Sequence, residues 1–186
     1  MKKWIIGSFV GAIIVFAWQA LSWMMMDLHA AEHKYTPAQE QIMSSLNAAN
    51  LEDGNYMVPN APPTASREEM ENVWKNNDGK PWALIIYGRA ASANMATPMI
   101  MGFVIDLILV ILMISILVRG GLPSFLGIFT GSIAVGVFSF LWEPYMMHNW
   151  YQVSWSSIAA HLYDAIGAWG LCGLWLGWWL RRPVNP

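Results

Sequence analysis

Two long apolar runs lie on either side of a short arginine-bearing turn in residues 97–142, TPMIMGFVIDLILVILMISILVRGGLPSFLGIFTGSIAVGVFSFLW. The first run, 97–118, contains one charged residue, Asp106, and the second, 122–142, contains none. Because an α-helix rises ~1.5 Å per residue, each run is long enough to cross the ~30 Å hydrocarbon core of a bilayer. The sequence therefore predicts two neighbouring membrane spans joined by a tight hairpin.

Two further apolar runs lie towards the ends of the chain. The run Trp4–Met26 is longer than the ~7–15-residue apolar core of a cleavable signal peptide, so we expect it to be a retained anchor. The run Ile158–Leu180 supplies a fourth span. The sequence thus predicts an α-helical membrane protein, and with their flanking residues its transmembrane helices are expected at 1–28, 97–118, 122–145 and 156–182.

The composition of the 186-residue chain agrees with a membrane protein. Hydrophobic residues make up 56% of it and charged residues 12%, whereas roughly a quarter of an ordinary soluble domain is charged. The formal net charge of -2 argues against nucleic acid as a partner, because phosphate contacts need clustered Lys and Arg. The single cysteine, Cys172, excludes an intrachain disulfide and a cysteine-based zinc site.

The charged residues beside the runs predict the orientation of the chain. Four spans place both termini on one side of the bilayer, and the flanks on that side carry only basic residues: Lys2, Lys3, Arg119, Arg181 and Arg182. Basic flanks remain on the cytoplasmic side. We therefore expect a multi-pass protein of a bacterial-type inner membrane, with both termini cytoplasmic and residues 29–96 extracytoplasmic.

The segment 29–96 is predicted to form a small α+β domain. Two stretches, TPAQEQIMSSLNAAN and SREEMENVWKNN, each begin with a capping-box pattern, Thr36 with Gln39 and Ser66 with Glu69, and therefore predict helices. The stretches GNYMV and PWALIIYG are typical of strands. No phosphate-binding glycine loop or nucleophile elbow occurs in this α-β-α-β pattern.

Pairs of small residues four positions apart recur in the predicted spans. The glycine pairs are Gly7 with Gly11, Gly127 with Gly131, and Gly173 with Gly177. Such spacing lets helix backbones approach each other closely. The pairs indicate either packing inside the four-helix bundle or an interface with a second copy of the chain or with other membrane subunits.

Ionisable residues in and beside the apolar runs are the candidates for a functional site. Counted at ~1.5 Å per residue from the basic flanks, they fall in the outer half of the bilayer or at its outer rim. The candidates for catalysis are Asp106, Glu143, His161 and Asp164. The candidates for metal ligands are His29, His33, Glu143, His148, His161 and Asp164. Histidine nitrogen and carboxylate oxygen are both ligands of zinc.

The same residues also have a purely structural interpretation. Asp164 lies in the first turns of its predicted helix, where a negative charge interacts favourably with the helix dipole. His161 can form a hydrogen bond with Asp164, with Glu143 or with a loop carbonyl. The stretch MMHNWYQVSWSS is then a loop at the membrane rim. No H-E-x-x-H motif points to a metal, and the methionines beside the histidines would suit copper(I) as well as core packing.

The sequence favours a non-catalytic role over an enzymatic one. The preferred hypothesis is an accessory, assembly or scaffolding subunit of a membrane complex, in contact with the lipid bilayer and acting as a homo-oligomer or with other membrane subunits. No cofactor is predicted outright. The alternative is a metal-dependent hydrolase or metal-binding protein at the outer membrane interface, with a divalent metal such as zinc. A third hypothesis is transport of protons, ions or small solutes through Asp106.

Overall fold

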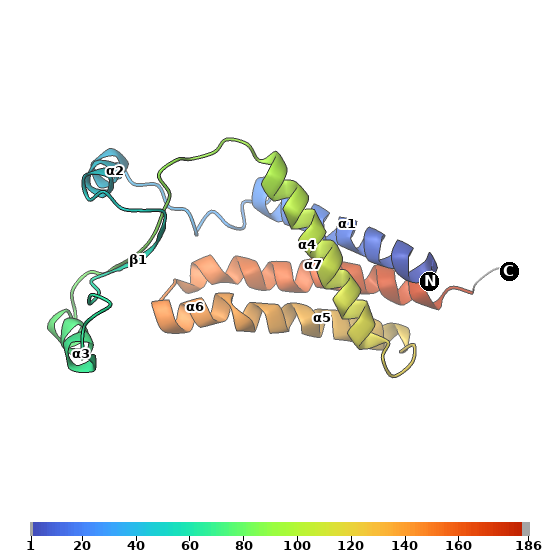
Figure 1. Ribbon diagram of the computed structural model, residues 1–186. Helices are drawn as coiled ribbons and strands as arrows, with labels where there is room; N and C mark the ends of the chain where they lie inside the picture. The colour runs from blue at the N-terminus through green and yellow to red at the C-terminus, as the bar shows by residue number, and fades with distance from the viewer. Residues whose placement is uncertain (1, 184–186) are drawn as a thin grey trace. The chain divides into compact units, whose positions relative to one another are not determined.

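The computed structural model describes residues 2–183 and divides them into two compact units. The helical unit comprises the described residues up to Lys34 and from Met95 onwards. It contains α1 (Lys2–Met24), α4 (Ala96–Leu117), α5 (Phe125–Trp142), α6 (Pro144–Tyr151) and α7 (Trp155–Arg181), as Figure 1 shows. The small unit, Tyr35–Asn94, contains α2 (Gln39–Ala48), β1 (Gly54–Val58), α3 (Arg67–Asn76) and β2 (Ala83–Tyr87).

Three segments within residues 2–183 are long and apolar enough to cross a membrane. They are α1, α4 and the segment Phe125–Tyr151, which consists of α5, Glu143 and α6. The helix α7, which is 27 residues long and contains His161 and Asp164, is not among them. The protein is therefore a mainly helical chain with three segments suited to a membrane, and the fourth span stays a prediction.

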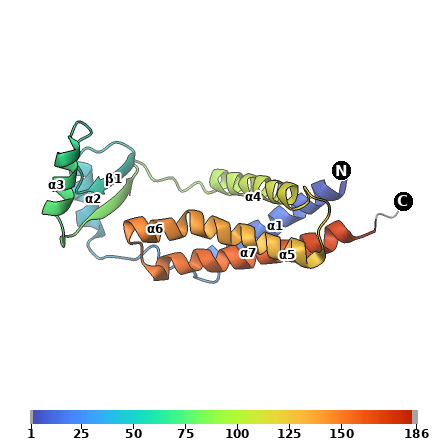
Figure 2. The same cartoon turned by 90° about the horizontal axis from the view of Figure 1, so that it is seen from below.

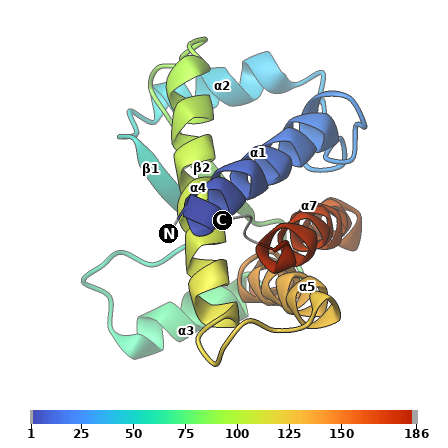
Figure 3. The same ribbon diagram turned by 90° about the vertical axis from the view of Figure 1, so that its right-hand side faces the viewer.

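The helix α7 is the centre of the helical unit. It packs along α5 and against α1, and α1 packs in turn against α4. The helices α5 and α7 lie side by side (Figures 1 and 2), whereas α4 is inclined to both (Figures 1 and 3). The core that they share is apolar and includes Val15, Val110, Ile128 and Leu176, one from each of α1, α4, α5 and α7.

The start of α1 and the end of α7 lie together. The Lys3 ammonium donates a hydrogen bond to the carbonyl of Leu180 over 3.1 Å, and the Trp179 indole donates one to the carbonyl of Lys3 over 2.8 Å. The Arg181 guanidinium donates to the carbonyl of Pro123, in the turn between α4 and α5, over 2.8 Å. Three of the basic flanks seen in the sequence thus meet at one end of the helical unit.

Close contacts between the helices pass through glycines. A Cβ atom at Gly136 would lie 2.2 Å from the carbonyl oxygen of Ala165. This close approach of α5 to α7 therefore requires a glycine at position 136. The predicted glycine pairs also have neighbours within the chain: a Cβ at Gly11 would meet Val110 at 3.0 Å, and one at Gly173 would meet Ser132 at 2.8 Å. Packing inside the bundle accounts for these contacts.

The small unit has the predicted order of elements, with one difference at a helix start. Its strands pair antiparallel, from Gly54 opposite Tyr87 to Val58 opposite Ala83. The capping box of α3 is confirmed, because the Ser66 hydroxyl accepts from the Glu69 N–H over 3.2 Å and the Ser66 N–H donates to the Glu69 carboxylate over 2.7 Å. Hydrogen bonding to Ser66 lowers the pKa of Glu69, and the bond to the Ser66 backbone contributes more than the bond to its side chain.

The predicted capping box at Thr36 was wrong. The Thr36 hydroxyl accepts from the N–H of Ala38, two residues on, over 3.2 Å, and α2 begins only at Gln39. The stretch predicted as a rim loop was also wrong in part, because Pro144 opens the short helix α6. Residues 29–34, which were predicted to begin the small domain, belong to the helical unit, since His29 contacts α7.

Candidate metal centre

The loop that follows α1 carries a buried histidine. The helix ends at Met24, and Asp27 adopts a left-handed φ of 55° that turns the chain back. His29 is only 4% exposed, and its ring stacks on the indole of Trp23 with ring centroids 3.8 Å apart. Stacking and burial hold the imidazole in one orientation, with both of its nitrogens directed at other side chains.

The first turns of α7 lie against this loop. The Ser157 hydroxyl donates to the carbonyl of Ala31 over 3.1 Å and so ties the loop to the helix. His161, one turn further along α7, places its Nε2 atom 3.3 Å from the carboxylate of Glu32. The rings of His29 and His161 are edge-to-face, with centroids 5.1 Å apart. Two histidines that are far apart in the sequence therefore lie beside one carboxylate.

A second carboxylate, Asp164, completes the group from the other side of His29. The Nε2 atom of His29 is 2.9 Å from one oxygen of Asp164, and the Trp18 indole donates to the other oxygen over 2.9 Å. The Nδ1 atom of His29 contacts the carboxylate of Glu32. His29 is thus held between two carboxylates, each of which binds a different nitrogen of its ring.

The two contacts of His29 need a proton or a metal ion on each side of the ring. A neutral imidazole has one N–H group, whereas an ionised carboxylate can only accept hydrogen bonds. If the N–H at Nε2 points to Asp164, the lone pair of Nδ1 faces the oxygen lone pairs of Glu32. A metal ion or a proton between those two atoms removes the repulsion.

The donor atoms lie close enough together to bind one metal ion. One ligand atom from each of His29, Glu32 and His161 lies within 4.8 Å of the other two. Tetrahedral zinc with bonds of ~2.0–2.1 Å separates its ligand atoms by roughly 3.3 Å, and the His161 to Glu32 distance is 3.3 Å. Metal entry would replace the direct contact of His29 with Glu32. Asp164 would then fix the ring of His29 from behind, as carboxylates commonly do for metal-bound histidines.

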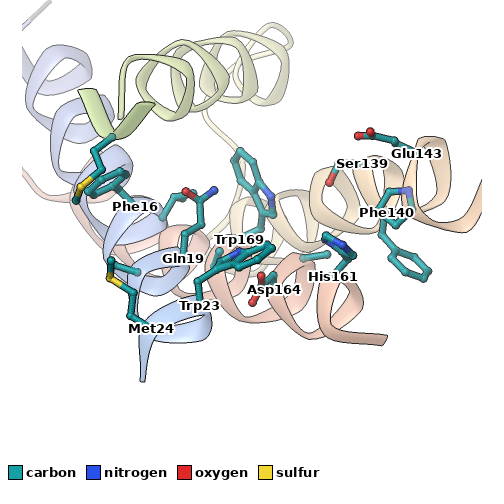
Figure 4. A pocket seen from close by; sticks show the side chains of 16 residues that line it. Phe16, Gln19, Trp23, Met24, Ser139, Phe140, Glu143, His161, Asp164 and Trp169 are labelled. Atoms are coloured by element: carbon teal, nitrogen blue, oxygen red, sulfur yellow. The ribbon is translucent and has the colours of Figure 1, made fainter. Parts of the chain in front are cut away.

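Two cavities adjoin this group and share His161. The larger has a volume of about 410 Å³ and the smaller about 240 Å³. Glu143, Pro144 and His161 line both of them. Figure 4 shows Trp23, Asp164 and His161 close together on one wall of the larger cavity, with Glu143 and Ser139 coming from the end of α5. Glu32 lines the smaller cavity, so two of the three candidate ligands, Glu32 and His161, border open space, whereas His29 is buried.

The structure brings together only some of the residues singled out in the sequence. His29, His161 and Asp164 form one group with Glu32. Glu143 lines the cavities beside it. The remaining candidates lie elsewhere: His33 is exposed and tilted against Trp23, His148 contacts the carbonyl of Val153 at 2.6 Å, and Asp106 accepts from Gln19 over 3.2 Å between α1 and α4.

Glu32 was missed in the sequence, although a signal for it exists. The pattern His-x-x-carboxylate occurs twice, as His29 with Glu32 and as His161 with Asp164. In the structure His29 contacts Glu32 and also Asp164, and His161 contacts Glu32. The repeated spacing would have added Glu32 to the candidates, but the contacts between the two pairs depend on how the loop folds onto α7.

Comparisons with protein-family models, with curated proteins and with solved structures found no match to this chain.

Proposed function

We propose that this protein is a membrane protein that binds a divalent metal ion, with zinc as the best fit. The observation that supports the proposal is the convergence of His29, Glu32 and His161, whose ligand atoms lie within 4.8 Å of one another beside two cavities. Two histidines and a glutamate form one of the ligand sets of catalytic zinc sites, which keep a fourth position open.

The chemistry that such a centre supports is hydrolysis. Zinc supplies a Lewis acid that lowers the pKa of bound water to about 7 and so makes hydroxide available at neutral pH. Asp164 holds the ring of His29 through its Nε2 atom, and Trp18 holds Asp164. Glu143 lines both cavities beside His161 and is the carboxylate placed to accept a proton from a water molecule there.

Zinc binding by the purified full-length protein tests the proposal. We expect metal-stripped protein to take up close to one zinc ion per chain, and cobalt(II) in its place to give the intense visible absorption of a tetrahedral site. Uptake below about 0.1 zinc ion per chain would overturn the proposed metal site. The Glu68→Gln variant, which changes a glutamate of the small unit, serves as the control for adventitious binding.

We also propose that α7 is a fourth span and that both termini face the cytoplasm of a bacterial-type cell, which places the small unit outside. The meeting of Lys3, Arg181 and the turn after Arg119 at one end of the helical unit supports a common side for these basic flanks. Reporter fusions are expected to be active in the cytoplasm at both termini and outside it within Tyr35–Asn94. Termini on opposite sides would contradict the arrangement.

A further inference from the structure

The larger cavity has an apolar wall and a polar end. Its wall comes mainly from aliphatic and aromatic side chains of α1, α5 and α7, among them Val15, Phe16, Ala20, Phe140 and Trp169. Its polar side chains Ser139, Glu143, His161 and Asp164 lie towards one end, whereas Gln19 lies nearer Phe16 (Figure 4). At about 410 Å³ it lies within the ~300–1,000 Å³ range of pockets that bind small molecules. A ligand that fits it must itself be apolar at one end and polar at the other.

The rim of the cavity indicates where such a ligand would enter. Met24 at the end of α1 is 71% exposed, and Met99 near the start of α4 is 41% exposed. Both side chains are apolar and belong to segments suited to a membrane. These exposed lining side chains face lipid when the helices are embedded, so a membrane amphiphile is the ligand that reaches the cavity most directly.

The charges at the polar end restrict the head group. Both oxygens of Asp164 are occupied, by Trp18 and by His29. Glu143 is exposed and lines both cavities, so its carboxylate is available to a ligand. A carboxylate accepts hydrogen bonds from hydroxyl groups and repels an anion. This charge excludes an anionic head such as the free carboxylate of a fatty acid, and hydroxyl groups are donors that the carboxylate can accept.

We propose that the larger cavity binds a neutral single-chain lipid ester of the monoacylglycerol class. Its acyl chain lies along the apolar wall, its ester group lies at His161, and its hydroxyl groups reach Glu143 and the smaller cavity. Only the reaction of this lipid rests on the proposed function. With the metal bound, the ester bond would be hydrolysed: water adds across it, and a fatty acid and a free polyol leave. Binding of the lipid itself requires no metal.

A photocrosslinking experiment on metal-stripped protein in phosphatidylcholine nanodiscs tests the binding. The probe is a diazirine analogue of monoolein, and the competitors are monoolein and oleate, which carry the same acyl chain. We expect adducts on peptides that line the cavity, and monoolein to compete at least about 10-fold better than oleate, a ratio equivalent to 1.4 kcal/mol. Glu143→Gln is expected to abolish this preference, because it removes the charge that repels oleate.

A matched pair of variants locates the site. Ala20 lines the cavity and is partly buried, so Ala20→Phe is expected to fill the space and reduce labelling by at least about 10-fold. Ala17, three residues earlier on the same helix, is exposed and outside the lining, so Ala17→Phe is expected to label like the natural protein.

The possible results separate this inference from the proposed function. Equal labelling of both variants, or equal competition by monoolein and oleate, would overturn the lipid site. Zinc uptake is measured on the same samples and is expected to be unchanged by Ala20→Phe, because Ala20 is not one of the three ligand residues. Specific labelling without zinc uptake would uphold the lipid site and reject the metal centre.

Discussion

Replacing His161 by alanine is expected to abolish zinc binding while the helical unit stays folded. The substitution removes one of three ligands, and this loss exceeds the ~10–100-fold decrease in affinity that follows the loss of an outer partner of a ligand. His161 has a side chain that is 34% exposed, so its removal leaves no large buried space. His29 is a poorer choice for this test, because it is buried and stacked on Trp23. Affinity is measured by competition with a chromophoric chelator.

Two further variants make the result specific to this site. His33→Ala removes an exposed histidine four residues after His29 and outside the ligand group, so zinc affinity is expected to stay unchanged. Asp164→Asn keeps an acceptor for Trp18 but takes the negative charge from behind His29, so affinity is expected to fall about 10–100-fold. If His33→Ala weakened binding as much as His161→Ala, the proposed ligand set would be incorrect.

The fold could be predicted wherever local physics decides the structure. The apolar runs around Asp106 and Gly136 have to form helices in lipid, because a helix satisfies its own backbone hydrogen bonds. The Ser66 capping box could be predicted for a similar reason, since its partners are three residues apart. The same pattern at Thr36 did not predict the helix start, because a threonine hydroxyl can instead bind an N–H two residues on.

The candidate site could be predicted only in part, because its contacts join segments that are far apart in the chain. Residue type alone selected His29, His161 and Asp164. Glu32 becomes a ligand candidate only when the loop after α1 folds onto the first turns of α7, and no local pattern encodes that approach. Asp106 was also selected by residue type, and Gln19, a polar residue at a similar depth in the neighbouring apolar run, is its hydrogen-bond donor.

The role of an accessory subunit stays a prediction, and the structure changes what supports it. The glycine pairs that suggested an interface with other subunits have close neighbours inside the chain, such as Val110 beside Gly11. The helices of the small unit keep exposed apolar side chains, including Met43 and Trp74. The small unit is therefore a better candidate for contact with a partner than the glycine faces. If so, fewer partner chains should be isolated with the Trp74→Ala protein than with the natural protein.

The second large effect is expected at Gly136, where α5 and α7 touch. A Cβ atom there would lie 2.2 Å from the carbonyl oxygen of Ala165, which is a backbone atom and cannot rotate aside. Gly136→Ala must therefore separate the two helices. Overpacking of this kind costs about 1–3 kcal/mol, which outweighs the gain in helix propensity of roughly 1 kcal/mol when alanine replaces glycine. We expect a lower midpoint of thermal unfolding in detergent.

Gly170, on the facing helix, provides the matched control for this effect. A Cβ atom at Gly170 would have as its nearest neighbour Ile133 at 3.9 Å, which is an ordinary van der Waals contact. Gly170→Ala should therefore keep the helix-propensity gain without the clash, and its unfolding midpoint should equal or exceed that of the natural protein. A Gly136→Ala protein as stable as the Gly170→Ala protein would mean that α5 and α7 do not meet at this point. The contact at Gly136 also matters for the candidate site, because the larger cavity lies between residues at the end of α5, such as Glu143, and residues of α7, such as His161 and Asp164.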